Sequence, residues 1–200
     1  VTEDLLRQKV LKESEEKFRV LADEAPVSIM HFDANGYISF VNKWHINVFT
    51  RGKLGKDFFL NKKVSELPGL KSAKVTEELE KILHGKTIIL DQVHIPKFAA
   101  GHEGYQSIKG VPIYQDTTII GGILIREDIT ARIKTEIELR KSEARYRGVV
   151  EDQTELICRF SPDFSLTFVN KAYCKYFGQK EQELIGTNLI SLIPEEDQPK

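Results

Sequence analysis

The sequence is poor in cysteine, in long apolar runs and in excess charge of either sign. Its 200 residues include two cysteines, Cys158 and Cys174, which indicates reduced thiols rather than a disulfide framework. The longest apolar run, Ile119–Ile125, has seven residues, whereas about 20 are needed to cross a bilayer. With 29 Lys and Arg against 30 Asp and Glu, the formal charge is −1, so no basic excess indicates a nucleic acid or an anionic membrane as partner.

The N-terminus also lacks the apolar centre of a secretory signal, and no part of this segment is expected to insert into a membrane. We therefore expect a cytoplasmic location, or the cytosolic portion of a larger signalling protein. A content of 40% hydrophobic and 30% charged residues is that of an ordinary globular protein with one to two domains.

What the sequence does contain is an internal repeat with an offset of 128 residues. Ser14–Arg19 aligns with Ser142–Arg147, and Phe40–Lys43 aligns with Phe168–Lys171. Nine of the thirty positions from Ser14 to Lys43 are identical to their partners. A period this long predicts tandem domains rather than a stacked repeat array.

Hydrophobic periodicity predicts an α+β fold. Asn35-Gly36 is a strong hairpin signal, and the strand patterns alternate in polarity. The expected elements are a helix over Leu5–Glu24, strands over Ser28–Asp33 and Tyr37–Val41, a helix over Lys43–Thr50, turns over Arg51–Leu70, a helix over Thr76–Leu83, strands over Lys86–Ile95, Tyr105–Tyr114 and Thr118–Arg126, and a helix over Ala131–Arg147. They predict a five-stranded antiparallel sheet with short helices on one face, flanked by long amphipathic connector helices.

Four segments follow from this pattern. We expect an N-terminal connector helix over residues 1–25, a first domain over 26–130, a helical linker over 131–148 and the N-terminal part of a second, truncated domain over 149–200. The second copy lacks counterparts of the long helix and the last three strands, so we expect it to be unstable in isolation. Near-heptad apolar seams on the connector helices predict a homodimer formed through them.

The motifs of both copies resemble those of PAS domains. They are Phe32-Asp33-Ala34-Asn35-Gly36 before Ile38–Asn42, the closing Asp128-Ile129-Thr130, and Phe168–Ala172 with Leu184-Ile185-Gly186 in the second copy. The resemblance implies a curved five-stranded sheet with helices over one face, often enclosing a small-molecule pocket. It also implies a sensory module of a sensor histidine kinase or diguanylate cyclase, with a downstream output domain in the same polypeptide.

The candidate ligand pocket consists of residues expected to point inward from the hairpin, the helices and the last strand. They are Met30, Phe32, Phe40, Trp44, His45, Phe58, Leu79, Ile123 and Ile125. Apolar lining does not distinguish a packed core from an occupied cavity, so both interpretations stay open. The candidate signal-relay junction is Asp128, Ile129 and Thr130, because the last strand enters the following helix through these residues.

Other chemistries have little support. The five histidines, His31, His45, His84, His94 and His102, lack the spacing of metal ligands. Some PAS domains hold haem through a histidine on the long helix; His84 is the candidate there, but it lies beside the helix-terminating Gly85, so haem is not supported. The light-sensing PAS subclass needs a reactive cysteine in a helix after the hairpin, and the first copy has no cysteine, so flavin photochemistry is not supported either. The segment Gly52–Asp57 has glycines too close together for a phosphate loop.

The sequence therefore predicts the sensory region of a two-component signalling protein that detects a small ligand or a redox state. The alternative is a ligand-free PAS scaffold for protein interaction and dimerisation. No catalytic residues are expected in this chain; the expected output of the full protein is a histidine kinase or, alternatively, a diguanylate cyclase.

Overall fold

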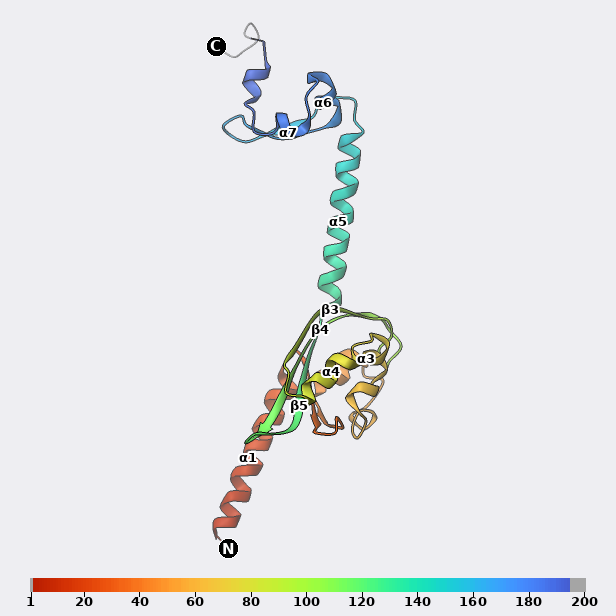
Figure 1. The fold of residues 1–200 in the computed structure, drawn as a ribbon, viewed down its shortest axis with the longest axis vertical. Coiled ribbons are helices and arrows are strands. Elements are labelled where there is room, and N and C mark those ends of the chain that lie inside the picture. Colours follow the sequence, from red (N-terminus) through yellow and green to blue (C-terminus); the bar gives the residue numbers. More distant parts are fainter. Residues whose placement is uncertain (1, 195–200) are drawn as a thin grey trace. The chain divides into compact units, whose positions relative to one another are not determined.

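The computed structural model describes residues 2–194, with side chains from residue 5 onward. The chain divides into two compact units between Lys134 and Thr135, and each unit is described by itself (Figure 1). The expected second domain over residues 149–200 falls within the second unit, and its residues 195–200 lie outside the described residues.

The first unit holds a helix, a hairpin, a helical middle section and three long strands. Its elements are α1 (Thr2–Glu24), β1 (Ser28–Asp33), β2 (Ile38–Val41), α2 (Lys43–Phe49), the 3₁₀ turns η1 (Lys56–Phe58) and η2 (Val64–Glu66), α3 (Pro68–Ser72), α4 (Thr76–Leu83), β3 (Ile88–Ile95), β4 (Gly104–Gln115) and β5 (Thr118–Asp128). The strands form one five-stranded sheet in the order β2-β1-β5-β4-β3, with every neighbouring pair antiparallel. The predicted α+β fold with a five-stranded antiparallel sheet is confirmed.

The hairpin between β1 and β2 forms where Asn35-Gly36 predicted it. Asp33 Oδ1 accepts hydrogen bonds from the backbone amides of Asn35 and Tyr37, both at 2.9 Å, and Gly36 has a φ of +82° that favours glycine. The pairing of β1 with β5, which places Met30 opposite Leu124, joins this hairpin to the three-stranded meander. Residues more than 90 positions apart in the sequence thus become neighbours at the centre of the sheet.

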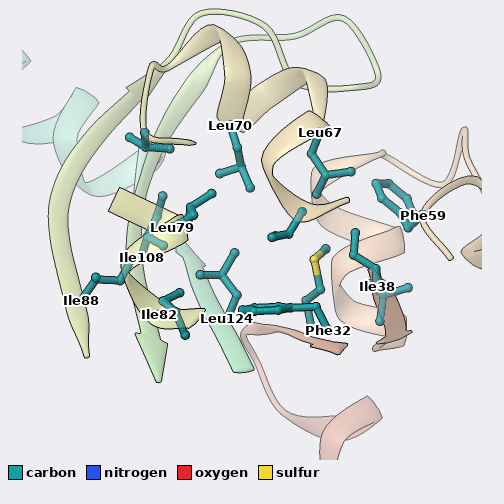
Figure 2. Close-up of a cluster of buried hydrophobic side chains, with 14 residues drawn as sticks. Phe32, Ile38, Phe59, Leu67, Leu70, Leu79, Ile82, Ile88, Ile108 and Leu124 are labelled. Atoms are coloured by element: carbon teal, nitrogen blue, oxygen red, sulfur yellow. The ribbon is translucent and has the colours of Figure 1, made fainter. Parts of the chain in front are cut away.

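The core lies between the inner face of the sheet and helices α3 and α4, which cover that face (Figure 1). Figure 2 shows Leu70 and Leu79 from these helices beside Ile108 and Leu124 of the strands, all of them fully buried. Burying each such side chain contributes about 1.5–3 kcal/mol. A Cβ on Gly122 would lie 2.5 Å from Phe32 Cζ, so that glycine allows close packing.

The second unit is smaller and contains a two-stranded sheet. Helix α5 (Thr130–Glu151) begins in the first unit; it is followed by β6 (Cys158–Phe160), β7 (Leu166–Val169), α6 (Lys171–Phe177), α7 (Glu181–Leu184) and the 3₁₀ turn η3 (Leu189–Leu192). A small cluster of Leu166, Val169, Tyr173 and Leu184 forms its core. Helix α5 continues four residues beyond the predicted end at Arg147, because Gly148 is tolerated within an exposed helix.

Candidate functional site

Three of the predicted pocket residues, Met30, Phe32 and Leu79, belong to the main core of the first unit. Each is essentially inaccessible to solvent. They pack with the other buried groups of the inner sheet face, as Figure 2 shows for Phe32 and Leu79. Their placement is that of packed core residues.

Three other predicted pocket residues lie on the outer face of the sheet. A bulge between His31 and Phe32 pairs Phe40 with His31, so Phe40 points away from the core and its ring lies 5.6 Å from that of Phe18 on α1. Ile123 is also paired with His31, and Ile125 with Ile29. The structure instead turns their neighbours on β5, among them Leu124, inward.

Trp44 and Phe58 are half-buried at the edge of the helical middle section. The Trp44 ring packs edge-on against Phe49 at 5.4 Å. The ammonium group of Lys62 lies over the Phe58 ring, 3.5 Å from the ring centroid, in a cation–π contact. Neither side chain lines the cavity described next.

Two predicted pocket residues border hollows: Leu79 lines a pocket with Gly36 and Val64, and His45 lines a smaller cavity beside the core. The cavity measures about 20 Å³ and is bordered by His45, Phe49, Thr50, Phe59, Leu67, Pro68, Gly69, Leu70, Phe98, Ala99 and Arg126. His45 is 2% exposed, shares a hydrogen bond of 2.8 Å between its Nδ1 and Ser28 Oγ, and packs edge-on against Phe59 at 4.6 Å. Burial, and secondarily the charge of Arg126, hold the pKa of His45 well below its usual value.

Arg126 is the functional candidate that the sequence analysis missed. It is 3% exposed and its Nε donates to Gln106 Oε1 at 2.7 Å, while its guanidinium lies 4.5 Å from the centroid of the Phe49 ring. Burial lowers the pKa of Arg126 to about 9. The signal that could have revealed it is its position two residues after Leu124, on the buried side of β5 and directly after the apolar run Ile119–Ile125.

The predicted relay junction ties the start of α5 to β4. Asp128 Oδ1 accepts from the Thr130 amide at 2.9 Å, and Thr130 Oγ1 accepts from the Tyr105 amide at 2.9 Å. The Ile129 amide donates to the Tyr105 carbonyl at 3.0 Å, and the Ile129 side chain is buried. The first turn of the helix therefore cannot shift without breaking bonds to the sheet.

A second junction, which the sequence analysis aligned but did not interpret, is built on Asn42. Its side-chain amide donates to the carbonyls of Ala22 and Val27, at 2.7 and 2.8 Å. Its Oδ1 accepts from the amides of Ile29 and His45, at 3.0 and 3.2 Å. One buried side chain thereby connects the end of α1, the start of β1 and the start of α2.

The second unit contains the same arrangement around Asn170. Its amide donates to the carbonyls of Val150 and Glu155, at 3.2 and 2.9 Å, and its Oδ1 accepts from the amides of Ile157 and Tyr173, at 3.1 and 3.0 Å. Each junction has an acidic side chain beside it: Asp23 accepts from the Lys43 amide, and Glu151 accepts from the Lys171 amide. The last turn of α5 is thus attached to the second unit as the last turn of α1 is to the first.

The remaining candidates stay apart from these sites. His84 Nδ1 bonds the Glu80 carbonyl at 2.9 Å, His94 lies 3.8 Å from Glu103, and His31 bonds Ser39 on the outer face. In residues 2–194, no three His, Cys, Asp or Glu side chains converge in a way that could hold a metal ion. Within the same range, no helix is long and apolar enough to cross a membrane.

The sheet order, with helices covering one face, defines the class of the first unit: an α+β fold of the PAS type. A solved RNA-binding Light-Oxygen-Voltage receptor has this fold, with a TM-score of 0.52, 14% identity, and coverage of 65% of this chain and 37% of the receptor. A PAS domain of an HTR-like protein from Haloarcula marismortui aligns with a TM-score of 0.48, at 17% identity over 62% of this chain and 98% of that domain.

The family model of the PAS fold matches residues 144–200, which lie within the second unit. The two-component sensor PprA of Pseudomonas aeruginosa is 34% identical over 70 residues, or 35% of this chain. The chain spans 8% of the length of that relative. It is therefore a distant relative of a two-component sensor, matched over a small part of that protein.

Proposed function

We propose that this chain is the sensory region of a two-component signalling protein. In this proposal two PAS units in tandem, over residues 26–130 and 149–200, detect a small ligand or a redox change. Connector helices then pass the response to a histidine kinase output in the same polypeptide. The relationship to a two-component sensor supports this reading over the alternative of a diguanylate cyclase output.

One observation carries the proposal: helix α5 is attached to a sheet-containing unit at each of its ends. Asp128, Ile129 and Thr130 attach its first turn to β4, and Asn170 attaches its last turn to the second unit. A change in β5 therefore reaches the first turn of α5, and the last turn of the same helix is bonded to Asn170. A ligand that favours one of two arrangements of this helix would shift their populations by its differential affinity.

The connector helices also support a homodimer. The apolar side chains of α1 at Leu6, Val10, Leu11 and Leu21 are each more than half exposed. A seam of near-heptad spacing is buried when it packs against a partner helix. We propose that a second copy of the chain provides that partner.

A ligand-free scaffold is the second candidate, and the closed core favours it. Most of the inner sheet face is filled by packed side chains, and the cavity beside it measures only about 20 Å³. A scaffold would need the exposed helices but no signal-dependent junction. The two functions therefore differ in what happens when the junction is weakened.

The test is a fusion of residues 1–150, through helix α5, to a histidine kinase core. In the Asp128→Ala/Thr130→Ala double variant we expect autophosphorylation to change by about fivefold or more, within the range of typical coupling energies. Glu127→Gln, at an exposed neighbouring position, serves as the matched control and should leave the rate unchanged. An unaltered rate in the double variant would contradict transmission through this junction.

A further inference from the structure

Helix α2 connects the Asn42 junction to a buried aromatic ring. The helix begins directly after Asn42, whose Oδ1 accepts from the His45 amide at 3.2 Å, and it ends at Phe49. The side-chain amide of Asn42 also donates to the Ala22 carbonyl in the last turn of α1. Because its backbone hydrogen bonds hold a helix together as one body, a displacement of the last turn of α1 is expected to reach the Phe49 ring.

The Phe49 ring stacks on the ring of Phe98. Their centroids lie 5.1 Å apart and their planes differ by 14°, and both side chains are buried. Phe98 belongs to the segment 96–103 between β3 and β4. Within this segment the Phe98 amide donates to the His102 carbonyl at 2.7 Å, and the Phe98 ring stacks on that of His102 at 4.7 Å. The two phenylalanines thus join α2 to a segment that lies far from it in the sequence.

Gly104 brings Phe98 close to the relay junction. A Cβ at this position would lie 3.2 Å from Phe98 Cε2 and 2.5 Å from Thr130 Oγ1. The glycine backbone is therefore packed closely against both side chains. Thr130 Oγ1 also accepts from the amide of Tyr105, the next residue of β4. The Phe98 ring and the first turn of α5 thus pack against the same point of the chain.

These contacts form one continuous path from the last turn of α1 to the first turn of α5, and the whole path lies in the first unit. Close-packed interiors have low compressibility and transmit displacement. Coupling between distant sites is carried by chains of packed side chains and rigid elements of this kind, and a measured coupling establishes it. If the aromatic rings only filled space, the two junctions would respond independently of each other.

We propose that the stack of Phe49 on Phe98 couples the end of α1 to the start of α5, so that the first unit relays a movement of the preceding helix. A loosened last turn of α1 displaces α2, moves Phe98 and weakens the hydrogen bonds that hold the first turn of α5. This relay adds a second input to the proposed sensory function, and it rests on that function only in treating α5 as the output helix. The coupling is reciprocal, as linkage requires.

The experiment measures hydrogen exchange by NMR in the intact 200-residue chain. Asp23→Ala removes the carboxylate that accepts from the Lys43 amide and so loosens the end of α1. The reporter is the Ile129 amide, which donates to the Tyr105 carbonyl. We expect Asp23→Ala to speed exchange of this amide by at least about fivefold relative to that of Leu124 at the centre of the sheet.

Glu24→Ala is the matched control for this first variant. It removes the same charge from the neighbouring, exposed position of α1. The exchange of the Ile129 amide should then equal that of the parent chain, because Glu24 is not the carboxylate that holds the start of α2.

Two variants break the stack from its two sides. Phe98→Leu and Phe49→Leu each remove one ring, and each should abolish the additional exchange that Asp23→Ala causes. Phe59→Leu is the matched control, because Phe59 is as buried as Phe98 and lines the same cavity but is not part of the stack. The fivefold effect should persist in that background. Fluorescence of Trp44, the single tryptophan of the chain, verifies that the first unit of each variant is folded.

Three results would overturn the inference: parent-like exchange of the Ile129 amide in Asp23→Ala, an undiminished effect in Phe98→Leu or Phe49→Leu, or an equal loss of the effect in Phe59→Leu. If any of these occurs while the kinase fusion still responds to Asp128→Ala/Thr130→Ala, the relay from α1 is wrong and the proposed function stands. If the coupling is measured but the kinase fusion does not respond, the relay through the stack stands and the proposed output through α5 fails.

Discussion

At the residue scale, Asn42 satisfies four backbone groups with one side chain. The groups belong to Ala22, Val27, Ile29 and His45, and the side chain that bonds them is fully buried. Neither a hydrophobic residue nor a carboxylate offers two donors and an acceptor in this geometry. The stability of the first unit should therefore depend strongly on this asparagine.

Asn42→Ala is expected to lower the free energy of unfolding by about 2–4 kcal/mol, because it leaves several buried backbone groups without partners. Urea unfolding of the intact chain measures the change. Asn47→Ala, on the exposed side of α2, is the matched control and should stay within about 0.5 kcal/mol of the parent chain. A similar loss in both variants would show that the junction has no special role.

His45 gives the first unit a dependence on pH with a definite sign. Its pKa in the folded chain lies well below the ordinary value of 6.5, so the unfolded chain takes up a proton first as the pH falls. The contribution of His45 to the free energy of unfolding is therefore complete above about pH 6.5. Below that pH the free energy of unfolding decreases, by up to about 1.4 kcal/mol per pH unit. His31 and His102, whose pKa values burial also lowers, add to the same trend.

Urea unfolding between pH 7 and pH 5 tests this expectation. The His45→Gln variant should lose part of the decrease, while His84→Gln, at an exposed position, should keep the decrease of the parent chain. The attribution to His45 fails if both variants follow the parent curve.

The residue scale also marks the limit of sequence-based prediction. Asp128 and Thr130 were identified because a cap and the helix that it starts are adjacent in sequence. Alternation along β5 shows two faces, but it does not say which one is buried when both carry apolar groups. Ile123 and Ile125 were therefore assigned inward, and Arg126, which does face inward, was overlooked.

At the scale of elements, glycines determine how closely the helices approach the sheet. Gly122 lies under Ile82 of α4, and a Cβ there would be 2.8 Å from Ile82 Cγ2 as well as close to Phe32. Gly148 on α5 has open space around it. The same substitution should therefore have opposite effects at these two positions.

Gly122→Ala is expected to destabilise the first unit by about 1–3 kcal/mol through overpacking. Gly148→Ala is expected to stabilise helix α5 by about 0.5–1 kcal/mol, because alanine is the better helix former. Thermal unfolding of the intact chain measures both changes. A destabilising Gly148→Ala would indicate that α5 needs a flexible point near its end.

The elements themselves were largely predictable, because each rests on local signals: the turn at Asn35-Gly36, the strand alternation and the helical periodicity. The pairing of β1 with β5 was not stated in advance. It depends on a contact between residues more than 90 positions apart, for which a single sequence offers no local signal. The bulge that turns Phe40 outward has the same origin, since it results from pairing and not from propensity.

At the scale of the whole molecule, the exposed apolar side chains of α1 predict self-association. We expect the Leu6→Gln/Val10→Gln double variant to weaken a dimer by at least about tenfold, because both side chains lie on the proposed seam. Light scattering coupled to size-exclusion chromatography over a range of concentrations measures the change. Lys12→Gln/Glu15→Gln, on the opposite side of the helix, is the control. A parent chain that is monomeric at every concentration would contradict the proposed dimer.

The amide of Asn42 and that of Asn170 make corresponding bonds 128 positions apart, each holding the end of a preceding helix. Because each junction consists of one side chain bonded to backbone groups, it places few requirements on the neighbouring side chains. Units joined in this way are interchangeable, so copies can be gained, lost or exchanged between proteins without new contacts having to evolve at each connection. The other positions of the two copies are then free to differ in sequence without weakening this junction.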